Sequence, residues 1–185
     1  MTALAERYPQ IIPYQEDRWD FPKVQGDCFV RAKSKMLRYY FEALEQKQLD
    51  REDRILIANR CFFDYAVYSR SYAALGWLAP SKLRYLEELA GRMFEEKPQH
   101  VVIYNPPLET LRERIQRRWK ATGIKKWREE DFGYLEVVQH EFATLYERNI
   151  IPDALYLTHQ NVDENVEAIA RWLALTEEPA LEVAL

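Results

Sequence analysis

The sequence predicts an α/β fold in which a parallel sheet carries helices on both faces. Three short runs, 54–59, 100–105 and 154–158, are apolar at most positions, as strands covered on both faces are. Between them lie longer stretches in which apolar residues recur with the 3.6-residue period of a helix. This alternation is typical of parallel sheets, because parallel strands need a crossover connection that is usually helical.

The first half of the chain contains two of the expected strands. Residues 2–8 match the end of an amphipathic helix that Pro9 stops, and 10–14 follow as a strand ahead of 54–59. The other helices expected in this half are 28–46, 62–74 and 80–96, the last with Ser81 as its N-cap. The apolar stripe of the first of these consists of Phe29, Met36, Tyr40 and Leu44.

The second half of the chain contains the strands 100–105 and 154–158. The helices expected around them are 108–120, 128–149 and 162–175. Their inward-facing residues are Leu108, Leu111 and Ile115 on the first helix and Phe132, Leu135, Phe142 and Leu145 on the second. No repeat or linker divides the chain, so residues 1–185 are expected to form one domain.

The composition excludes several classes of protein. With 48% hydrophobic and 14% aromatic residues, the chain can bury a full core, and its net charge of −4 argues against binding to nucleic acid polymers. The sequence has neither a signal peptide nor an apolar run of spanning length, so we expect a cytoplasmic protein without a membrane partner. Cys28 and Cys61 are expected to be reduced thiols, and the three histidines are too scattered for a zinc site.

Polar side chains follow the strand 54–59, where ligands bind in open α/β sheets. Asn59 and Arg60 stand at its carboxyl end, and Asp64 follows one helical turn later. Arg60 could hold a substrate or a phosphate; alternatively, Asn59 only caps the next helix and Arg60 and Asp64 are exposed. Trp19, beyond the strand 10–14, is either a platform for base stacking or a buried rim residue.

A cationic segment occupies residues 112–128 of this acidic chain. Because a guanidinium fork matches phosphate oxygens, arginines on a hairpin around 112–130 suit a lid that closes over a polyphosphate. The alternative is a solvated helix face balanced by Glu129, Glu130 and Asp131. The basic residues are Arg112, Arg114, Arg117, Arg118, Lys120, Lys125, Lys126 and Arg128.

In their order, these segments resemble the deoxynucleoside kinase family, within the wider group that includes thymidylate kinases. The segments that carry the resemblance are "PYQEDRW", "ILIANRCFFDYAVYSR", "VVIYNPPLETLRERIQRR" and "REEDFGYLEVVQHEFATLY". The resemblance implies a P-loop nucleoside or nucleotide kinase-like fold that uses ATP and Mg²⁺. It also implies a nucleoside or nucleoside monophosphate as acceptor, and a homodimer formed through 29–44 or 83–93.

On the acceptor side, the resemblance implies that Arg60 lies near the substrate's 5′ end and that Trp19 and Glu16 lie near the nucleoside. Arg31 falls near the position of a base-reading glutamine in many nucleoside kinases. An arginine cannot make the paired hydrogen bonds to a base that the glutamine amide makes, but it could bind a phosphate. A monophosphate acceptor therefore stays open.

On the donor side, the resemblance assigns Arg114 and Arg118 to an Arg-Ile-x-x-Arg pair and Lys120 to the next lid position, all contacting donor phosphates. The family's general base, an Asp or Glu before the motif arginine, is replaced by Asn59, which cannot take a proton. Asp64 or Glu16 could substitute for it.

The largest departure from the family is the phosphate loop. No G-x-x-x-x-G-K-[ST] occurs among residues 1–185, which include only five glycines. We therefore expect the chain to begin just after the loop, to lack the first strand between 54–59 and 100–105, and to be inactive alone. The alternative is a non-catalytic, kinase-like protein that binds a nucleotide or a partner.

Overall fold

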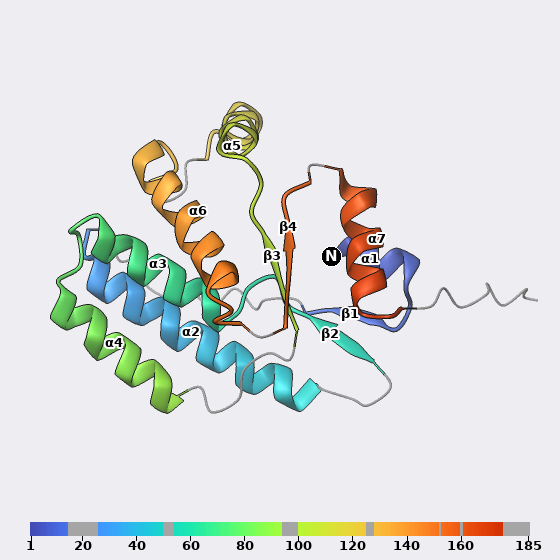
Figure 1. The fold of residues 1–185 in the computed structure, drawn as a ribbon, viewed down its shortest axis with the longest axis horizontal. Coiled ribbons are helices and arrows are strands. Elements are labelled where there is room, and N and C mark those ends of the chain that lie inside the picture. Colours follow the sequence, from blue (N-terminus) through green and yellow to red (C-terminus); the bar gives the residue numbers. More distant parts are fainter. Residues whose placement is uncertain are drawn as a thin grey trace, which may run out of the picture.

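The computed structural model describes residues 1–14, 26–49, 54–93, 100–124, 128–151, 153–159 and 161–175 (Figure 1). Strands and helices alternate along most of this length. No helix in these ranges is long and apolar enough to cross a membrane. The elements are α1 (Thr2–Arg7), β1 (Ile11–Pro13), α2 (Cys28–Leu49), β2 (Ile55–Ile57), α3 (Phe62–Ala74), α4 (Pro80–Met93), β3 (Val101–Tyr104), α5 (Leu108–Thr122), α6 (Phe132–Glu147), β4 (Ala154–Leu157) and α7 (Val162–Trp172).

The strands form two parallel pairs. β1 pairs with β2, with Ile12 opposite Leu56, and β3 pairs with β4, with Ile103 opposite Tyr156. The predicted parallel α/β fold is confirmed. Among the described residues β2 and β3 are not hydrogen-bonded to each other, so the four strands do not form one continuous sheet.

Each strand pair is covered by its own helices. The β1–β2 pair packs against α1 and α7, where Leu4, Ile11 and Val166 are buried together. The β3–β4 pair packs against α3 and α6 through a cluster that includes Val67, Ile103 and Leu145. In Figure 1, α1 and α7 lie on one side of the strands, and α3 lies on the other side with α2 and α4.

The largest core lies among the helices. Tyr72 of α3 stacks on Tyr134 of α6 with ring centroids 5.9 Å apart, and Trp77 lies 5.6 Å from Tyr134. Met36 of α2 and Leu86 of α4 are fully buried in the same cluster. This core fixes α2 and α3 side by side, and both elements contribute to the candidate site described below.

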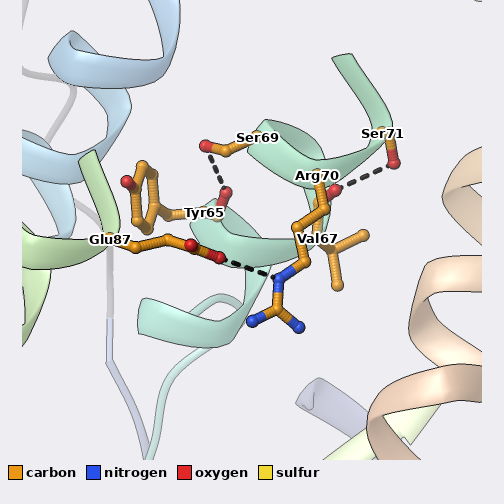
Figure 2. A network of polar contacts seen from close by, with 6 residues as sticks. All are labelled: Tyr65, Val67, Ser69, Arg70, Ser71 and Glu87. Carbon is orange, nitrogen blue, oxygen red and sulfur yellow. Dashed lines mark hydrogen bonds and ion pairs between the residues drawn. The ribbon is translucent and has the colours of Figure 1, made fainter. Parts of the chain in front are cut away.

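Within α3, two buried serines are satisfied by the helix itself (Figure 2). The Ser69 hydroxyl donates to the Tyr65 carbonyl and the Ser71 hydroxyl to the Val67 carbonyl, each at 2.8 Å. Such bonds to the carbonyl four residues back let a helix bury hydroxyls without another partner. Arg70 pairs with Glu87 at 3.2 Å and so links α3 to α4.

Several predicted element details need correction. The helix predicted to be capped by Ser81 begins at Pro80, whose fixed φ and missing N–H suit the first helical position. Residues 94–96, in the predicted end of that helix, lie outside the described residues. Residues 28–46 are helical as predicted, and the helix continues to Leu49.

The buried faces also differ from prediction in three places. On α2 the buried positions begin at Cys28 rather than Phe29, and Leu44 is 42% exposed. On α6, Phe132 is exposed and stacks against the Arg112 guanidinium at 4.2 Å. β3 is buried on alternate residues only, because Val102 and Tyr104 are exposed. The prediction that this strand is covered on both faces is therefore wrong for the described structure.

Candidate functional site

The candidate site lies where β1 and β2 end. Asn59 and Arg60 follow β2, with Asn59 exposed and Arg60 partly buried. A cavity of about 620 Å³ opens at this end of the two strands. Its lining residues are Met1, Thr2, Ala5, Glu6, Pro13, Tyr14 and Asn59. The position agrees with the general rule that ligands bind beyond the carboxyl ends of parallel strands.

The start of α3 is held by a reciprocal cap. Cys61 is the N-cap residue, and its backbone N–H donates to the Asp64 carboxylate at 2.9 Å. Asn59 therefore does not cap this helix, and that alternative is wrong. Burial raises the pKa of the Cys61 thiol to about 12, so this residue stays a neutral thiol at physiological pH.

Lys35 of α2 faces the same region. Its Nζ lies 3.7 Å from the centroid of the Tyr68 ring of α3. Burial, followed by the positive charges of Arg31 and Arg60, lowers the pKa of Lys35 to about 7, and Asp64 only partly opposes this. Lys35 was not among the predicted site residues, although its spacing of four residues from Arg31 places both on one helix face.

Tyrosine hydroxyls surround these charges and stay protonated. Burial, with the Asp64 carboxylate as the next cause, raises the pKa of Tyr68 to about 12. Burial likewise raises the pKa of Tyr72 and Tyr134, while Arg31 lowers both. The influence of Arg31 on two hydroxyls indicates that its guanidinium lies near the Tyr72–Tyr134 stack.

The end of β3 is fixed by a buried asparagine. The Asn105 side-chain amide donates to the Gln139 carbonyl at 2.9 Å and to the Tyr156 hydroxyl at 2.8 Å. These bonds join β3, β4 and α6 just before α5 begins. The start of α5 is therefore held at the carboxyl end of β3.

The three predicted lid residues on α5 have different surroundings. Arg114 lies over the ring of Tyr104, the last residue of β3, at 5.3 Å from its centroid. Arg118 forms an ion pair with Glu129, as the solvated-face interpretation predicts. Lys120 is exposed near the end of α5, which stops at Gly123 in a left-handed conformation. A lid role for the three residues stays a prediction, with Arg114 the one that lies at a strand end.

The other predicted site residues are distributed as follows. Arg31, Arg60 and Asp64 are brought together around Lys35 and Tyr68. Trp19 and Glu16 lie outside the described residues, as do Lys125 and Lys126 of the predicted hairpin. Their predicted roles are therefore untested.

The described residues do not fit an ATP phosphate cradle. Such a cradle needs several successive backbone N–H groups in a glycine-rich turn, whereas the glycines with positive φ, Gly26, Gly76 and Gly123, lie far apart. In the described ranges, no three His, Cys, Asp or Glu side chains are grouped to hold a metal ion.

Comparison with solved structures identifies the fold class. The structure matches that of a deoxyadenosine kinase from M. mycoides with the products dCMP and a flexible dCDP bound, with a TM-score of 0.70. The match covers 94% of this chain and 90% of the other, at 12% sequence identity. No family and no curated protein matches the chain by sequence. The chain has an α/β fold similar to that of a P-loop deoxynucleoside kinase.

Proposed function

We propose that the intact protein catalyses ATP-dependent phosphorylation of a (deoxy)nucleoside or nucleoside monophosphate. The observation that carries the proposal is the fold similarity to a deoxyadenosine kinase over 94% of the chain. The polar residues after β2 support it, because they lie at the strand ends where such a fold binds its ligands. A cytoplasmic location is part of the proposal, since Cys28 and Cys61 form no disulfide.

On the acceptor side, Arg60 is proposed to bind at the 5′ end of the substrate and Arg31 to bind deeper in the site. Asp64 is the proposed proton acceptor for the attacking hydroxyl, because Asn59 cannot take a proton. The Asp64 carboxylate already accepts the Cys61 N–H, which orients it at the start of α3. Trp19 and Glu16 are proposed to contact the nucleoside.

On the donor side, Arg114, Arg118 and Lys120 are proposed to contact the phosphates of ATP, which would be bound with Mg²⁺. A phosphate loop is also required, since its N–H groups and lysine supply much of the stabilisation of the transferring group. Residues 1–185 contain no such motif. The proposed activity therefore needs a glycine-rich loop that residues 1–185 do not supply.

A second candidate is a non-catalytic, kinase-like protein that binds a nucleotide or a protein partner. Asn59 favours it, because it stands where the proposed reaction needs a carboxylate. Both candidates have the acceptor site, but only the enzyme candidate also has a phosphate loop for the donor. Only the enzyme candidate should transfer a phosphoryl group when ATP, Mg²⁺ and an acceptor are supplied together.

The test uses the protein expressed with its upstream in-frame codons. We expect turnover of ATP with at least one of the four deoxynucleosides or their 5′-monophosphates, measured by separation of the products. Arg60→Ala should lower kcat/KM at least tenfold, whereas Arg84→Ala on α4 should not change it. An upstream reading frame that encodes no Gly-rich loop, together with no turnover, would favour the non-catalytic candidate.

The 185-residue chain alone serves as the control for the donor-side argument. We expect no turnover with any of these acceptors, because no cradle for the donor phosphates is present in its sequence. Repeated turnover by the purified chain would contradict the assignment of the donor site.

A further inference from the structure

β3 passes into α5 through a short connection that consists of Asn105, Pro106 and Pro107 (Figure 1). Proline has a fixed φ and no N–H, so the two prolines leave few torsions free and cannot continue the strand ladder. Asn105 ends that ladder, because its N–H donates to the Leu157 carbonyl at 2.8 Å. α5 then begins at Leu108, with Pro107 as its N-cap and no side-chain cap. The orientation of α5 on the strands therefore depends on what holds this connection.

The connection is held by α6 through two hydrogen bonds that run in opposite directions. The Asn105 side-chain amide donates to the main-chain carbonyl of Gln139 at 2.9 Å. The Gln139 side-chain amide donates in turn to the main-chain carbonyl of Pro106. The Tyr156 hydroxyl of β4 accepts a further bond from the Asn105 amide at 2.8 Å. Asn105 and Pro106 are buried, so these bonds are partly shielded from competing water.

We propose that Gln139 is a positioning residue, which holds the connection before α5 and thereby keeps Arg114 at the carboxyl end of β3. The inference rests on the proposed function in taking Arg114 as a contact for the donor phosphates. It adds a residue of α6 that acts through α5 rather than on the substrate. Asn105 orients Gln139, because its side chain binds the Gln139 main chain.

The position of Arg114 is sensitive to the angle at which α5 leaves the connection. Arg114 stands six residues after Leu108, which is about 9 Å along the helix axis. A tilt of about 10° at the connection would therefore move it by about 1.5 Å. The Arg114 guanidinium now lies 5.3 Å from the ring centroid of Tyr104, the residue directly before Asn105. The arginine and the bonds that hold the connection thus meet at the same strand end.

Apolar packing alone would fix this angle less well. Ile115 is buried on α5, whereas Leu108 and Leu111 near its start are only partly buried. Apolar contacts have no preferred direction, so a small tilt of the helix costs them little. A hydrogen bond weakens steeply when its angle departs from linear, so the bond from Gln139 to Pro106 resists such a tilt.

The first experiment measures amide hydrogen exchange in the 185-residue chain. The two reporters flank the prolines: the Asn105 N–H, and the Leu111 N–H, which donates to the Pro107 carbonyl at 3.1 Å. Gln139→Met keeps the length of the side chain and removes the donor to Pro106. We expect exchange at both amides to become at least tenfold faster, because the connection opens more often. Unchanged exchange at both amides would overturn the proposal.

Leu145→Val is the matched control on the same helix. Leu145 is 2% exposed and lies in the cluster that contains Ile103 of β3, so shortening it removes core contacts and leaves the connection's hydrogen bonds in place. It should lower the thermal midpoint without changing exchange at Asn105 and Leu111, since ends of elements exchange through local opening. Equal acceleration in Leu145→Val and Gln139→Met would mean that lost stability explains the effect, and would overturn the proposal.

The second experiment tests whether Gln139 acts through Arg114. Inorganic triphosphate is titrated calorimetrically into the 185-residue chain and its variants. Gln139→Met should weaken binding at least fivefold, although it changes no charge. In the Arg114→Ala background the same substitution should weaken binding less than twofold, because its effect has to pass through the arginine. A purely structural role would give equal losses in the two backgrounds, and equal losses or no loss in the wild-type background would overturn the proposal.

The two experiments separate this inference from the proposed function. If the wild-type chain binds no triphosphate, or if Arg114→Ala binds it as the wild type does, the donor role of Arg114 is wrong. The exchange rates at Asn105 and Leu111 need neither triphosphate nor turnover. They would then still support Gln139 as the residue that positions α5 if they rise in Gln139→Met alone, and overturn it if they do not.

Discussion

Individual residues of α2 combine burial with charge. Glu42 is only 2% exposed and pairs with Arg38, whose side chain is a quarter exposed. Lys35, one turn before Arg38, has an aromatic ring beneath it and repulsive charges beside it. The same helix therefore contains an ion pair, Arg38–Glu42, and a lysine, Lys35, whose charged form is disfavoured by burial and by nearby positive charges. Removing the charge should have opposite effects on the free energy of unfolding at Glu42 and at Lys35.

Lys35→Met should change how stability depends on pH. The pKa of Lys35 is about 7 in the folded chain and 10.5 as a model value, so between these pH values the unfolded state binds more protons. Stability contributed by Lys35 therefore rises with pH across this window. From pH 7 to pH 9 the wild type should gain about 2 kcal/mol of unfolding free energy relative to Lys35→Met.

Urea denaturation of both proteins at the two pH values measures this difference. Comparing the variant with the wild type cancels the titration of the two cysteines, which they share. If the difference in unfolding free energy between the wild type and Lys35→Met is constant from pH 7 to pH 9, the pKa of Lys35 is not lowered in the folded protein.

Glu42→Ala should lower the free energy of unfolding by about 3 kcal/mol, because removing one partner of a buried ion pair leaves the other charge uncompensated. The exposed Glu88→Ala on α4 is the control and should change stability by less than about 0.5 kcal/mol. Equal effects in urea denaturation would show that Arg38 reaches solvent when its partner is lost.

At the level of residues, the sequence was informative at the strand ends and silent within the helices. Asn59, Arg60 and Asp64 could be found because polar residues directly after an apolar run mark the edge of a parallel sheet. Lys35 could not be found in the same way. A lysine on a helix is normally solvated, and only the packing of α3 against α2 brings Arg60 and Tyr68 over it.

At the level of elements, α5 connects two parts of the molecule. Its Arg114 lies over Tyr104 at the end of β3, and its Arg118 pairs with Glu129 in the segment that leads into α6. On this helix, Arg114 thus lies near the strand end, whereas Arg118 links α5 to the segment that follows it. We expect substitutions at the two positions to have different effects.

Arg114→Ala should weaken binding of ATP or inorganic triphosphate to the 185-residue chain while leaving its thermal midpoint unchanged within about 1 °C. Arg118→Ala should lower the thermal midpoint by about 2–4 °C, as expected for the loss of about 1 kcal/mol from a partly exposed pair. Calorimetry at low and moderate salt, with scanning of the same samples, measures both effects.

Lys82→Ala with Arg84→Ala on α4 is the control for non-specific charge attraction, which is screened over about 10 Å at 0.1 M salt. If this double variant weakens triphosphate binding as much as Arg114→Ala, the assignment of α5 to a lid is wrong.

Element types were predictable from the sequence because strand and helix periods differ, and each predicted strand contains an observed one. Which strands pair with each other depends on contacts between residues that are distant in sequence. Leu44 and Phe132 illustrate this limit, since both fit a helical stripe and yet are exposed in the structure. α4 begins at Pro80 and not after a Ser81 cap, because the fixed φ and missing N–H of proline suit the first helical position.

At the scale of the whole molecule, the two strand pairs are held together through helices. Within the described residues, no backbone hydrogen bond joins β2 to β3, and each strand is paired along one edge only. A missing strand between β2 and β3 stays a prediction, because the absence of pairing between them does not show what lies there.

Strands with unpaired edges favour association between chains, because their backbone N–H and C=O groups can pair with another strand. We therefore expect the 185-residue chain to show a weight-average mass that rises with concentration in sedimentation equilibrium. Val102→Lys places a charge on β3, at a residue 38% exposed, and should shift the chain toward the monomer, because a lysine on an edge strand opposes pairing. Val162→Lys makes the same change at the 59% exposed first residue of α7 and is the control. If both variants reduce association equally, net charge governs it; if neither does, the strand edges are not the associating surface.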